Sequence, residues 1–164
     1  MSRDYTDVVD FPDEVALRPI ARVRSPFTER HGTPRQPGME GPKEAGSVVG
    51  EVELLDHVPT AAIDDLAGFD HVWLIAFMHL NGPRLRPRVK PPRGGPKRGV
   101  LATRAPHRPN PIALSAVRLL AVRGRVLEVA DLDLLDGTPI LDIKPYIPDF
   151  DALPDASRGW LDEG

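Results

Sequence analysis

The sequence contains no cysteine, and this absence excludes a disulfide framework, a thiolate nucleophile and cysteine metal ligands. Long apolar runs are missing as well, because the longest one, near residues 72–78, is far too short to span a bilayer. The first residues, MSRDYTDVVDFPDE, are acidic and lack the basic start and apolar middle of a signal peptide. We therefore expect a cytoplasmic protein with no membrane contact.

The common signatures of nucleotide, metal and hydrolase sites are also missing. No GxxxxGK[ST], GxGxxG or GxSxG pattern occurs, and none of the five histidines stands in an HExxH arrangement. Without cysteine to assist them, these histidines do not form a recognisable zinc site. We expect no metal.

Acidic residues are absent from a long internal segment. Residues 71–127 contain twelve Lys and Arg and no Asp or Glu, although the whole chain has a net charge of −3. A segment of this charge is typical of a surface that faces a polyanion such as nucleic acid. The alternative is that folding brings the acidic flanks against this segment and neutralises it.

Short strands and long loops make up the rest of the pattern. The chain is long enough for one domain, which we place at residues 15–157, between a flexible leader at 1–14 and a tail at 158–164. Proline and glycine mark long loops at 28–47 and 81–99. One short helix is expected within residues 56–69. Strands are expected at 17–23, 47–54, 71–80, 100–103, 112–122, 125–129 and 139–143. This succession predicts an all-β, mainly antiparallel barrel or sandwich.

Two stretches next to predicted strands contain candidate binding residues. In Pro34-Arg35-Gln36-Pro37 the prolines restrict the backbone, and a guanidinium held in this way suits a carboxylate or a phosphate. The alternative is an ordinary surface turn. His79-Leu80-Asn81 follows the most apolar strand, where barrels place ligand contacts, although a lone histidine is more often structural.

The segment ATRAPHRPNPIALS, residues 102–115, contains Asn110 between two prolines. The following proline restricts Asn110 to an extended conformation, so its amide offers one acceptor and two donors at a nearly fixed position. Such a group suits recognition of an adenine or its exocyclic amine. The alternative is a proline-stiffened entry to a strand.

The segment DGTPILDIKPY, residues 136–146, alternates polar and apolar residues. On a strand, Asp142, Lys144 and Tyr146 would share one face. The face is either a solvated surface or part of a site, and Pro145 indicates a sheet edge or strand end.

Together these motifs resemble those of a known family. ATRAPHRPNPIALS resembles the signature ATRSxxRPNPIGxS, and LDLLDGTPILDIKPYIP resembles DLVDGTPVLDIKPYLP. PRQPG and GFDHVWLIAFMH match in the same order, so the resemblance runs from about residue 20 to residue 155. The family is that of the TrmO-like tRNA adenosine N6-methyltransferases.

The resemblance implies a single-sheeted β-barrel that binds S-adenosylmethionine near a homodimer interface. It implies methylation of N6 of threonylcarbamoyl-adenosine at tRNA position 37, beside the anticodon. Carried over by motif, the cofactor contacts are Pro34, Arg35, Gln36, His79, Leu80, Arg104, Leu114, Asp133, Leu135 and Asp136.

Further roles follow from the expected substrate, the anticodon arm of tRNA. We assign Asn110 as the acceptor for the adenine amine and Tyr146 as its stacking or hydrogen-bonding partner, and we treat both as catalytic. Lys144 would contact a phosphate or the substrate carboxylate. The RNA backbone would be held by Arg86, Arg88, Lys90 and Arg93.

Departures from the family pattern leave two alternatives open. Leu80 stands where bacterial members often have Gln, Ala105 replaces Ser, and Ala113 replaces Gly. We also expect this chain to lack the additional C-terminal domain of longer bacterial members. The alternatives are a methyltransferase of this fold with another, small-molecule substrate, and a non-catalytic RNA-binding module.

Overall fold

The protein is described by a computed structural model, which covers residues 12–29, 33–34, 48–82, 85–92 and 94–162. Most of the predicted leader therefore lies outside the described residues. Among the described residues, no helix has the length and hydropathy needed to cross a membrane.

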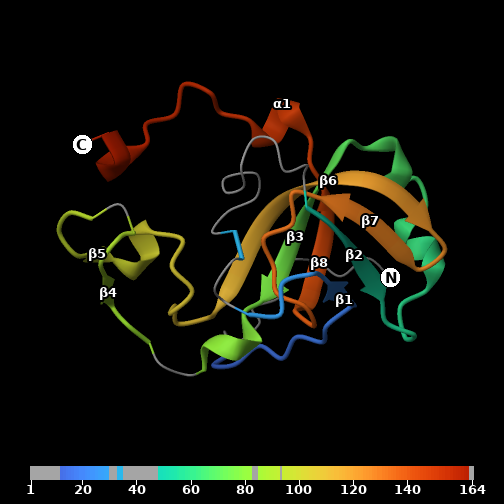
Figure 1. Cartoon of the computed structure of the whole chain (residues 1–164), viewed down its shortest axis with the longest axis horizontal. Coiled ribbons are helices and arrows are strands. Elements are labelled where there is room, and N and C mark those ends of the chain that lie inside the picture. The colour runs from blue at the N-terminus through green and yellow to red at the C-terminus, as the bar shows by residue number, and fades with distance from the viewer. Residues whose placement is uncertain (1–11, 30–32, 35–47, 83–84, 93, 163–164) are drawn as a thin grey trace.

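Six strands form one closed barrel, as Figure 1 shows. Around the ring the order is β1-β2-β7-β6-β3-β8, and every pair of neighbours is antiparallel. The strands are β1 (Ala21–Arg24), β2 (Val49–Leu54), β3 (His71–Phe77), β6 (Ile112–Arg123), β7 (Val126–Ala130) and β8 (Pro139–Pro145). The predicted all-β class is confirmed, and it takes the form of a barrel rather than a sandwich.

The barrel forms because alternate residues of each strand are apolar and point inward. Side chains on successive strand positions face opposite sides of a sheet, so one face of each strand fills the interior. Val52, Leu74, Val117, Leu127 and Ile140 are completely buried there. Outward positions are charged or partly exposed, as the burial pattern eBeBiB of β2 illustrates.

Two local predictions are wrong. Residues 100–103 are not a strand but contain the 3-10 turn η4 (Val100–Ala102), which the Thr103 hydroxyl closes by donating to the Val100 carbonyl at 2.9 Å. The expected helix within residues 56–69 consists of two 3-10 turns, η1 (Thr60–Ile63) and η2 (Leu66–Gly68). Asp65, in the left-handed region at φ 63°, separates them.

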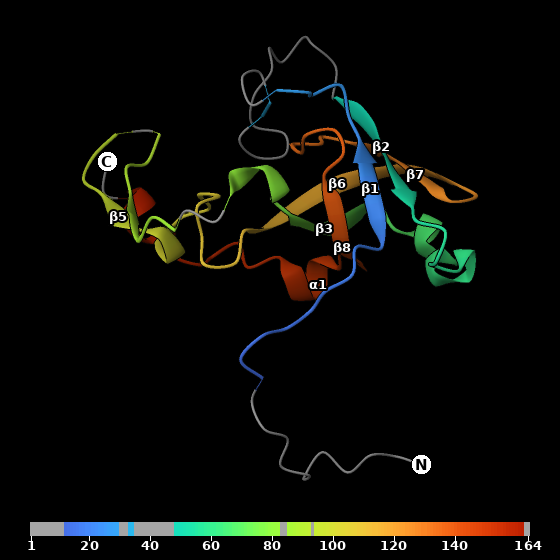
Figure 2. The same cartoon turned by 90° about the horizontal axis from the view of Figure 1, so that it is seen from below.

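A second, smaller region lies beside the barrel. β4 (Arg88–Val89) and β5 (Arg98–Gly99) form a separate two-stranded sheet, and η4 follows directly. Figures 1 and 2 show this hairpin to one side of the barrel, with the end of the described chain, η5 (Gly159–Asp162), next to it. Two more short elements are η3 (His79–Asn81) and the α-helix α1 (Pro148–Asp151).

Candidate functional site

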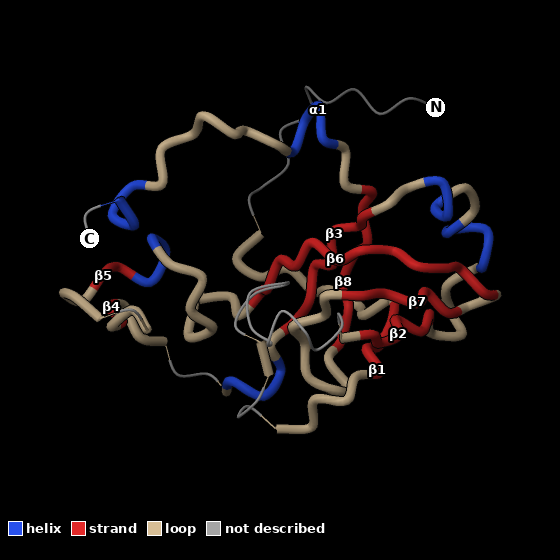
Figure 3. The backbone as a smooth tube through the Cα atoms, turned by 45° about the horizontal axis from the view of Figure 1, so that its top comes forward, coloured by secondary structure: helices blue, strands red, loops and turns tan. Residues whose placement is uncertain are grey.

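The polar loops of the two long motifs meet at one end of the barrel. At this end, which we call the site end, β1, β3 and β7 finish while β2, β6 and β8 begin. Figure 3 shows the six strands of the barrel and the loops that connect them. The described candidate residues on strands or connections of this end are Pro34, His79, Leu80, Arg104, Asn110, Leu114, Asp133, Leu135 and Asp136.

A partly buried carboxylate, that of Asp133, lies at the site end. Ser115, on the inward face of β6, is 2% exposed and donates a hydrogen bond of 2.7 Å to Oδ1 of Asp133. Burial raises the pKa of Asp133, while the Ser115 hydrogen bond and the positive charge of Arg104 act in the opposite direction. Arg104 and Asp133 were predicted from different motifs, and the fold places them within electrostatic reach of each other.

Asp136 fixes the loop between β7 and β8 against the end of β1. Its Oδ1 accepts a hydrogen bond from the Ser25 backbone N–H at 3.0 Å, and its own N–H donates to the Phe27 carbonyl at 2.7 Å. Gly137, at φ 74°, completes the predicted Asp-Gly turn and donates to the Val23 carbonyl at 2.9 Å. The loop that contains the predicted cofactor residues is therefore held by backbone groups of β1 and of the loop after it.

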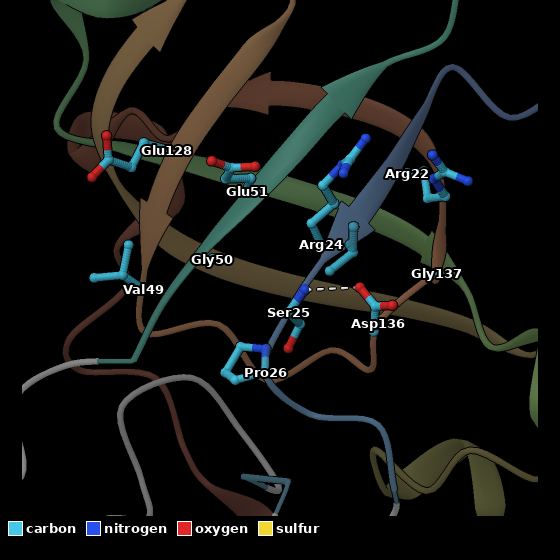
Figure 4. Close-up of a pocket in the computed structure, with 11 residues that line it drawn as sticks. Arg22, Arg24, Ser25, Pro26, Val49, Gly50, Glu51, Glu128, Asp136 and Gly137 are labelled. Carbon is cyan, nitrogen blue, oxygen red and sulfur yellow. Dashed lines mark hydrogen bonds between the residues drawn. The ribbon is translucent and has the colours of Figure 1, made fainter.

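A hollow of about 670 Å³ opens next to Asp136. Figure 4 shows that both cations and carboxylates line it, on the outer side of β1 and β2. Gly50 belongs to this wall, and a Cβ there would lie 2.6 Å from a methyl group of Leu132 and 2.9 Å from the Arg24 carbonyl oxygen. The close approach of these strands at the hollow therefore requires glycine. The lining residues are Arg22, Val23, Arg24, Ser25, Pro26, Val49, Gly50, Glu51, Glu128, Asp136 and Gly137.

Asn110 stands at the entry to β6. Its carbonyl accepts from Ile112 N–H at 2.7 Å, and the next carbonyl, that of Pro111, accepts from Met78 N–H at 2.7 Å. The second of these bonds joins the segment before β6 to the end of β3. Among the described residues, the Asn110 side-chain amide has no hydrogen-bond partner, and the residue is exposed. The amide is thus presented to solvent at the site end.

Arg108 is a structural residue of the site that sequence reasoning missed. Its Nη1 donates to the Thr103 carbonyl at 2.6 Å and to the Val100 carbonyl at 3.3 Å. Prolines at 106 and 109 remove backbone donors from this loop, so its carbonyls need a side-chain donor. A basic residue among closely spaced prolines is the signal that points to such a role.

Tyr146 and Lys144 lie at the other end of the barrel. Tyr146 N–H donates to the His71 carbonyl at 3.0 Å, and its ring centroid is 5.4 Å from that of Trp73. The length of β3, about 20 Å at the usual rise per residue, separates this position from Phe77 at the site end. Lys144 pairs with Asp142 at 2.8 Å, so the predicted shared face of these two residues is confirmed. A single chain does not bring Tyr146 to Asn110.

The candidate RNA contacts are in the hairpin region. Arg86, Arg88 and Lys90 lie in or beside β4, and Arg88 Nη2 donates to the Lys97 carbonyl at 2.7 Å. Three predicted contacts, Arg35, Gln36 and Arg93, fall outside the described residues.

The fold and this arrangement define a class: a closed antiparallel barrel with a polar end built from several separate loops. The model of the tRNA-methyltransferase O N-terminal domain matches residues 22–152, and the chain belongs to this family. The resemblance noted in the sequence is thereby confirmed.

Named relatives agree with this membership. The chain is 43% identical over 153 residues to a putative S-adenosylmethionine-dependent methyltransferase, RcsF, of Pseudomonas aeruginosa, covering 90% of this chain and 61% of the relative. It is 41% identical over 150 residues to the tRNA (adenine(37)-N6)-methyltransferase of Escherichia coli, covering 86% and 61%. A probable S-adenosyl-L-methionine-binding protein of Pyrococcus abyssi is 39% identical, with 93% and 79% covered.

Solved structures share the fold. The crystal structure of TrmO from Pseudomonas aeruginosa superposes with a TM-score of 0.73 at 40% identity, covering 89% of this chain and 62% of that one. The chain thus spans about 61% of the length of the Pseudomonas and Escherichia relatives.

Proposed function

We propose that this protein is an S-adenosylmethionine-dependent methyltransferase that methylates N6 of adenosine 37 in tRNA, beside the anticodon, in its threonylcarbamoyl form. The observation that supports the proposal is that Asp133, Arg104 and Asn110, from two separate motifs of a chain of this family, lie on connections at the site end. As a tRNA-modifying enzyme it would work in the cytoplasm.

The residues of the site end fit S-adenosylmethionine. When bound, this cofactor supplies an electrophilic methyl group on a positively charged sulfonium, together with an amino acid carboxylate and an adenosine. Asp133 and Asp136 offer carboxylates for its positive groups, and Arg104 offers a guanidinium for its carboxylate. Apolar and backbone contacts would come from Pro34, His79, Leu80, Leu114 and Leu135, together with Arg35 and Gln36.

Asn110 is the residue we assign to the substrate amine. The lone pair of an adenine N6 is delocalised into the ring, so an acceptor for its N–H and a fixed orientation favour attack on the methyl group. The exposed amide of Asn110, next to the Pro111 carbonyl that accepts from Met78 after β3, can accept that N–H.

We also infer a homodimer. Three apolar side chains next to the site end point outward from β3 and β6: Phe77 and Ile112 are each 39% exposed and Leu114 is 50% exposed. A second copy that covers them would remove this apolar surface from water. In one chain Tyr146 lies about a strand length from Asn110. Tyr146 and Lys144 keep their proposed roles only if the second copy presents them to this site.

The basic hairpin supports RNA as the substrate. Arg86, Arg88 and Lys90 belong to the segment without acidic residues, and they lie in or beside β4, which Figure 1 shows to one side of the barrel. Contacts of this kind release counterions, so tRNA binding should weaken steeply as salt increases.

Nucleoside mass spectrometry of tRNA after incubation with the protein and S-adenosylmethionine tests the proposal. We expect a methyl group on N6 of the modified adenosine at position 37, and calorimetry should show cofactor binding. Cofactor binding without tRNA methylation would favour a small-molecule substrate. Absence of cofactor binding at millimolar concentration would favour an RNA-binding module.

The role of Asn110 has its own test. Asn110→Ala should lower turnover on the order of 100-fold, the loss typical of a misplaced reactant, with cofactor affinity near that of the wild type. Asn110→Asp keeps an acceptor and should retain more activity than the alanine variant. Wild-type turnover in Asn110→Ala would contradict the assignment.

A further inference from the structure

The end of the described chain contacts the basic hairpin region through a tryptophan. Trp160 Nε1 donates a hydrogen bond of 2.7 Å to the Ala102 carbonyl, and the Arg98 guanidinium lies 5.3 Å from the centroid of the Trp160 ring. The cartoon and the tube agree that η5 lies beside η4 (Figures 1 and 3). We call residues 157–162 the C-terminal clasp.

The clasp is a defined turn. Gly159, at φ 58°, adopts a left-handed conformation that favours glycine, and its N–H donates to the Ser157 hydroxyl at 3.2 Å. Arg158 and Asp162 close the turn, because the Arg158 N–H donates to Asp162 Oδ2 at 3.3 Å and their side chains pair at 3.5 Å. Trp160 is therefore presented by a turn that its own neighbours stabilise.

The clasp contacts the segment that connects the hairpin to Arg104. Ala102 is the last residue of η4, and Arg104 follows two positions later. On the other side, Val100 N–H donates to the Pro87 carbonyl at 3.0 Å, which ties η4 to the start of β4. Trp160 thus contacts both Ala102, two residues before Arg104, and Arg98 of β5.

The region held by the clasp is otherwise bonded largely to itself. Arg86 N–H donates to the His107 carbonyl at 3.4 Å, and Arg108 donates to the carbonyls of residues 100 and 103. The C-terminal segment connects back to the barrel through α1, which follows β8 almost directly. The clasp therefore adds a non-covalent connection between the barrel and the hairpin region to the two covalent ones that the chain makes on either side of residues 86–108.

We propose that Trp160 is a positioning residue for tRNA, which fixes the basic hairpin relative to the site end. The inference rests on the proposed function and extends it to residues beyond the part matched by the family model, which ends at residue 152. A hairpin that is already ordered loses less conformational freedom when it binds, so its cations contact phosphates at lower cost. The cation–π contact with Arg98 holds β5, and with it the hairpin, against the Trp160 ring.

The test compares three variants of the full chain. Trp160→Ala should raise both the KM and the Kd for tRNA about tenfold, as expected for loss of one hydrogen bond and one cation–π contact. Trp160→Phe keeps a ring over Arg98 but lacks the indole N–H, and we expect an intermediate effect of about threefold. Phe150→Ala is the matched control, because Phe150 is an aromatic residue of the same C-terminal segment and is 80% exposed.

Two further measurements separate positioning from a merely structural role. In Trp160→Ala the cofactor Kd and the kcat at saturating tRNA should stay at their wild-type values, while amide exchange at residues 88–102 should accelerate. The dependence of tRNA affinity on salt should become shallower, because fewer phosphates are contacted at once.

Three outcomes would overturn the inference. Unchanged tRNA affinity in Trp160→Ala would show that Trp160 does not position the hairpin for tRNA. Equal losses of tRNA and cofactor affinity would show that Trp160 only stabilises the fold. Tighter tRNA binding would show that the clasp covers the hairpin instead of positioning it. Failure of the proposed function is seen separately, in a wild-type chain that does not methylate tRNA.

Discussion

The barrel and the basic hairpin region, residues 86–108, are stabilised by different kinds of interaction. The barrel has a continuous apolar core, in which residues such as Leu74 and Leu127 are completely buried. The hairpin has two residues in each strand, and its bends depend on side chains that donate to backbone carbonyls, mainly Arg108, Thr103 and Trp160. A rigid scaffold thus presents a loop region held by a few polar contacts.

The comparison predicts that stability and the proposed tRNA binding are separable in this protein. Burial of apolar surface accounts for most of the free energy of unfolding, whereas a single hydrogen bond contributes little to it. Loss of a polar contact in the hairpin should therefore open that region locally while the barrel stays folded. The following substitutions test this separation, beginning with the largest expected effect.

Leu74→Ala should destabilise the whole protein. Leu74 is completely buried in β3, between Ser115 of β6 and Ile143 of β8, and its truncation leaves a cavity. We expect the free energy of unfolding in urea to fall by about 2–5 kcal/mol. Leu120→Ala is the control, because Leu120 is 42% exposed, and its effect should be within about 0.5 kcal/mol. Similar losses in the two variants would contradict the assignment of the core.

Arg108→Ala should open the hairpin region and leave the barrel intact. The substitution removes the donor to two carbonyls, and each hydrogen bond from a charged group is worth about 1.5–3 kcal/mol. We expect faster amide exchange at residues 100–105 and weaker tRNA binding, with little change in the urea midpoint. Arg123→Ala, at a side chain that is 76% exposed, is the control. If the urea midpoint falls as far as in Leu74→Ala, the barrel and the hairpin region unfold as one cooperative unit, which contradicts their separation.

Asp133→Asn should stabilise the protein and weaken cofactor binding. Since burial raises the folded-state pKa of Asp133 above its unfolded value, the folded chain binds more protons between the two values. The free energy of unfolding therefore decreases as pH rises through this window, and it stays lower above it. Asparagine removes the partly buried charge and still accepts a hydrogen bond from the Ser115 hydroxyl.

Urea unfolding from acid to neutral pH measures this effect. The difference in free energy of unfolding between Asp133→Asn and the wild type should be smallest at low pH. It should grow until the pH exceeds the folded-state pKa of Asp133. Ser115→Ala is the companion variant, because it removes the hydrogen bond that lowers this pKa and should reduce stability. A less stable Asp133→Asn at neutral pH would show that the carboxylate is a structural requirement.

Glu128→Gln should have the smallest effect. Glu128 pairs with Arg123 across β6 and β7 at 3.4 Å, and both side chains are at least 36% exposed. Such a surface pair contributes about 0.5 kcal/mol or less, and high salt should abolish the difference. A loss that persists in high salt would indicate that Glu128 acts through the neighbouring hollow instead.

The barrel strands were predictable because alternation of apolar residues has a period that a sequence displays directly. Val49–Leu54 and Pro139–Pro145 were expected within a few residues of their bounds. The turn at Val100–Ala102 was missed because a short apolar run suits a strand as well as a 3-10 turn, and side-chain donors at Thr103 and Arg108 decide between them. Sequence spacing does not encode such contacts.

The candidate site was predictable in its motifs and not in its geometry. The motifs named Asp133 and Arg104, which the fold places within electrostatic reach of each other. They also paired Asn110 with Tyr146, which a single chain places at opposite ends of β3, because β8 runs the length of the barrel between its two polar ends. Nothing in the sequence indicated the contact made by Trp160, because its hydrogen-bond partner is the backbone carbonyl of residue 102.

The seam that closes the barrel also constrains how the chain folds. β1 and β8 pair through Ala21 with Ile140 and Arg22 with Pro139, so the ring joins the two ends of the domain. During synthesis, the barrel cannot close at β1 until β8, and therefore the whole intervening chain, has been made. Contacts of such long sequence separation form slowly, and until then β1 offers an unpaired edge to other chains. Folding, rather than final stability, is thus the stage at which this barrel is most exposed to misassembly.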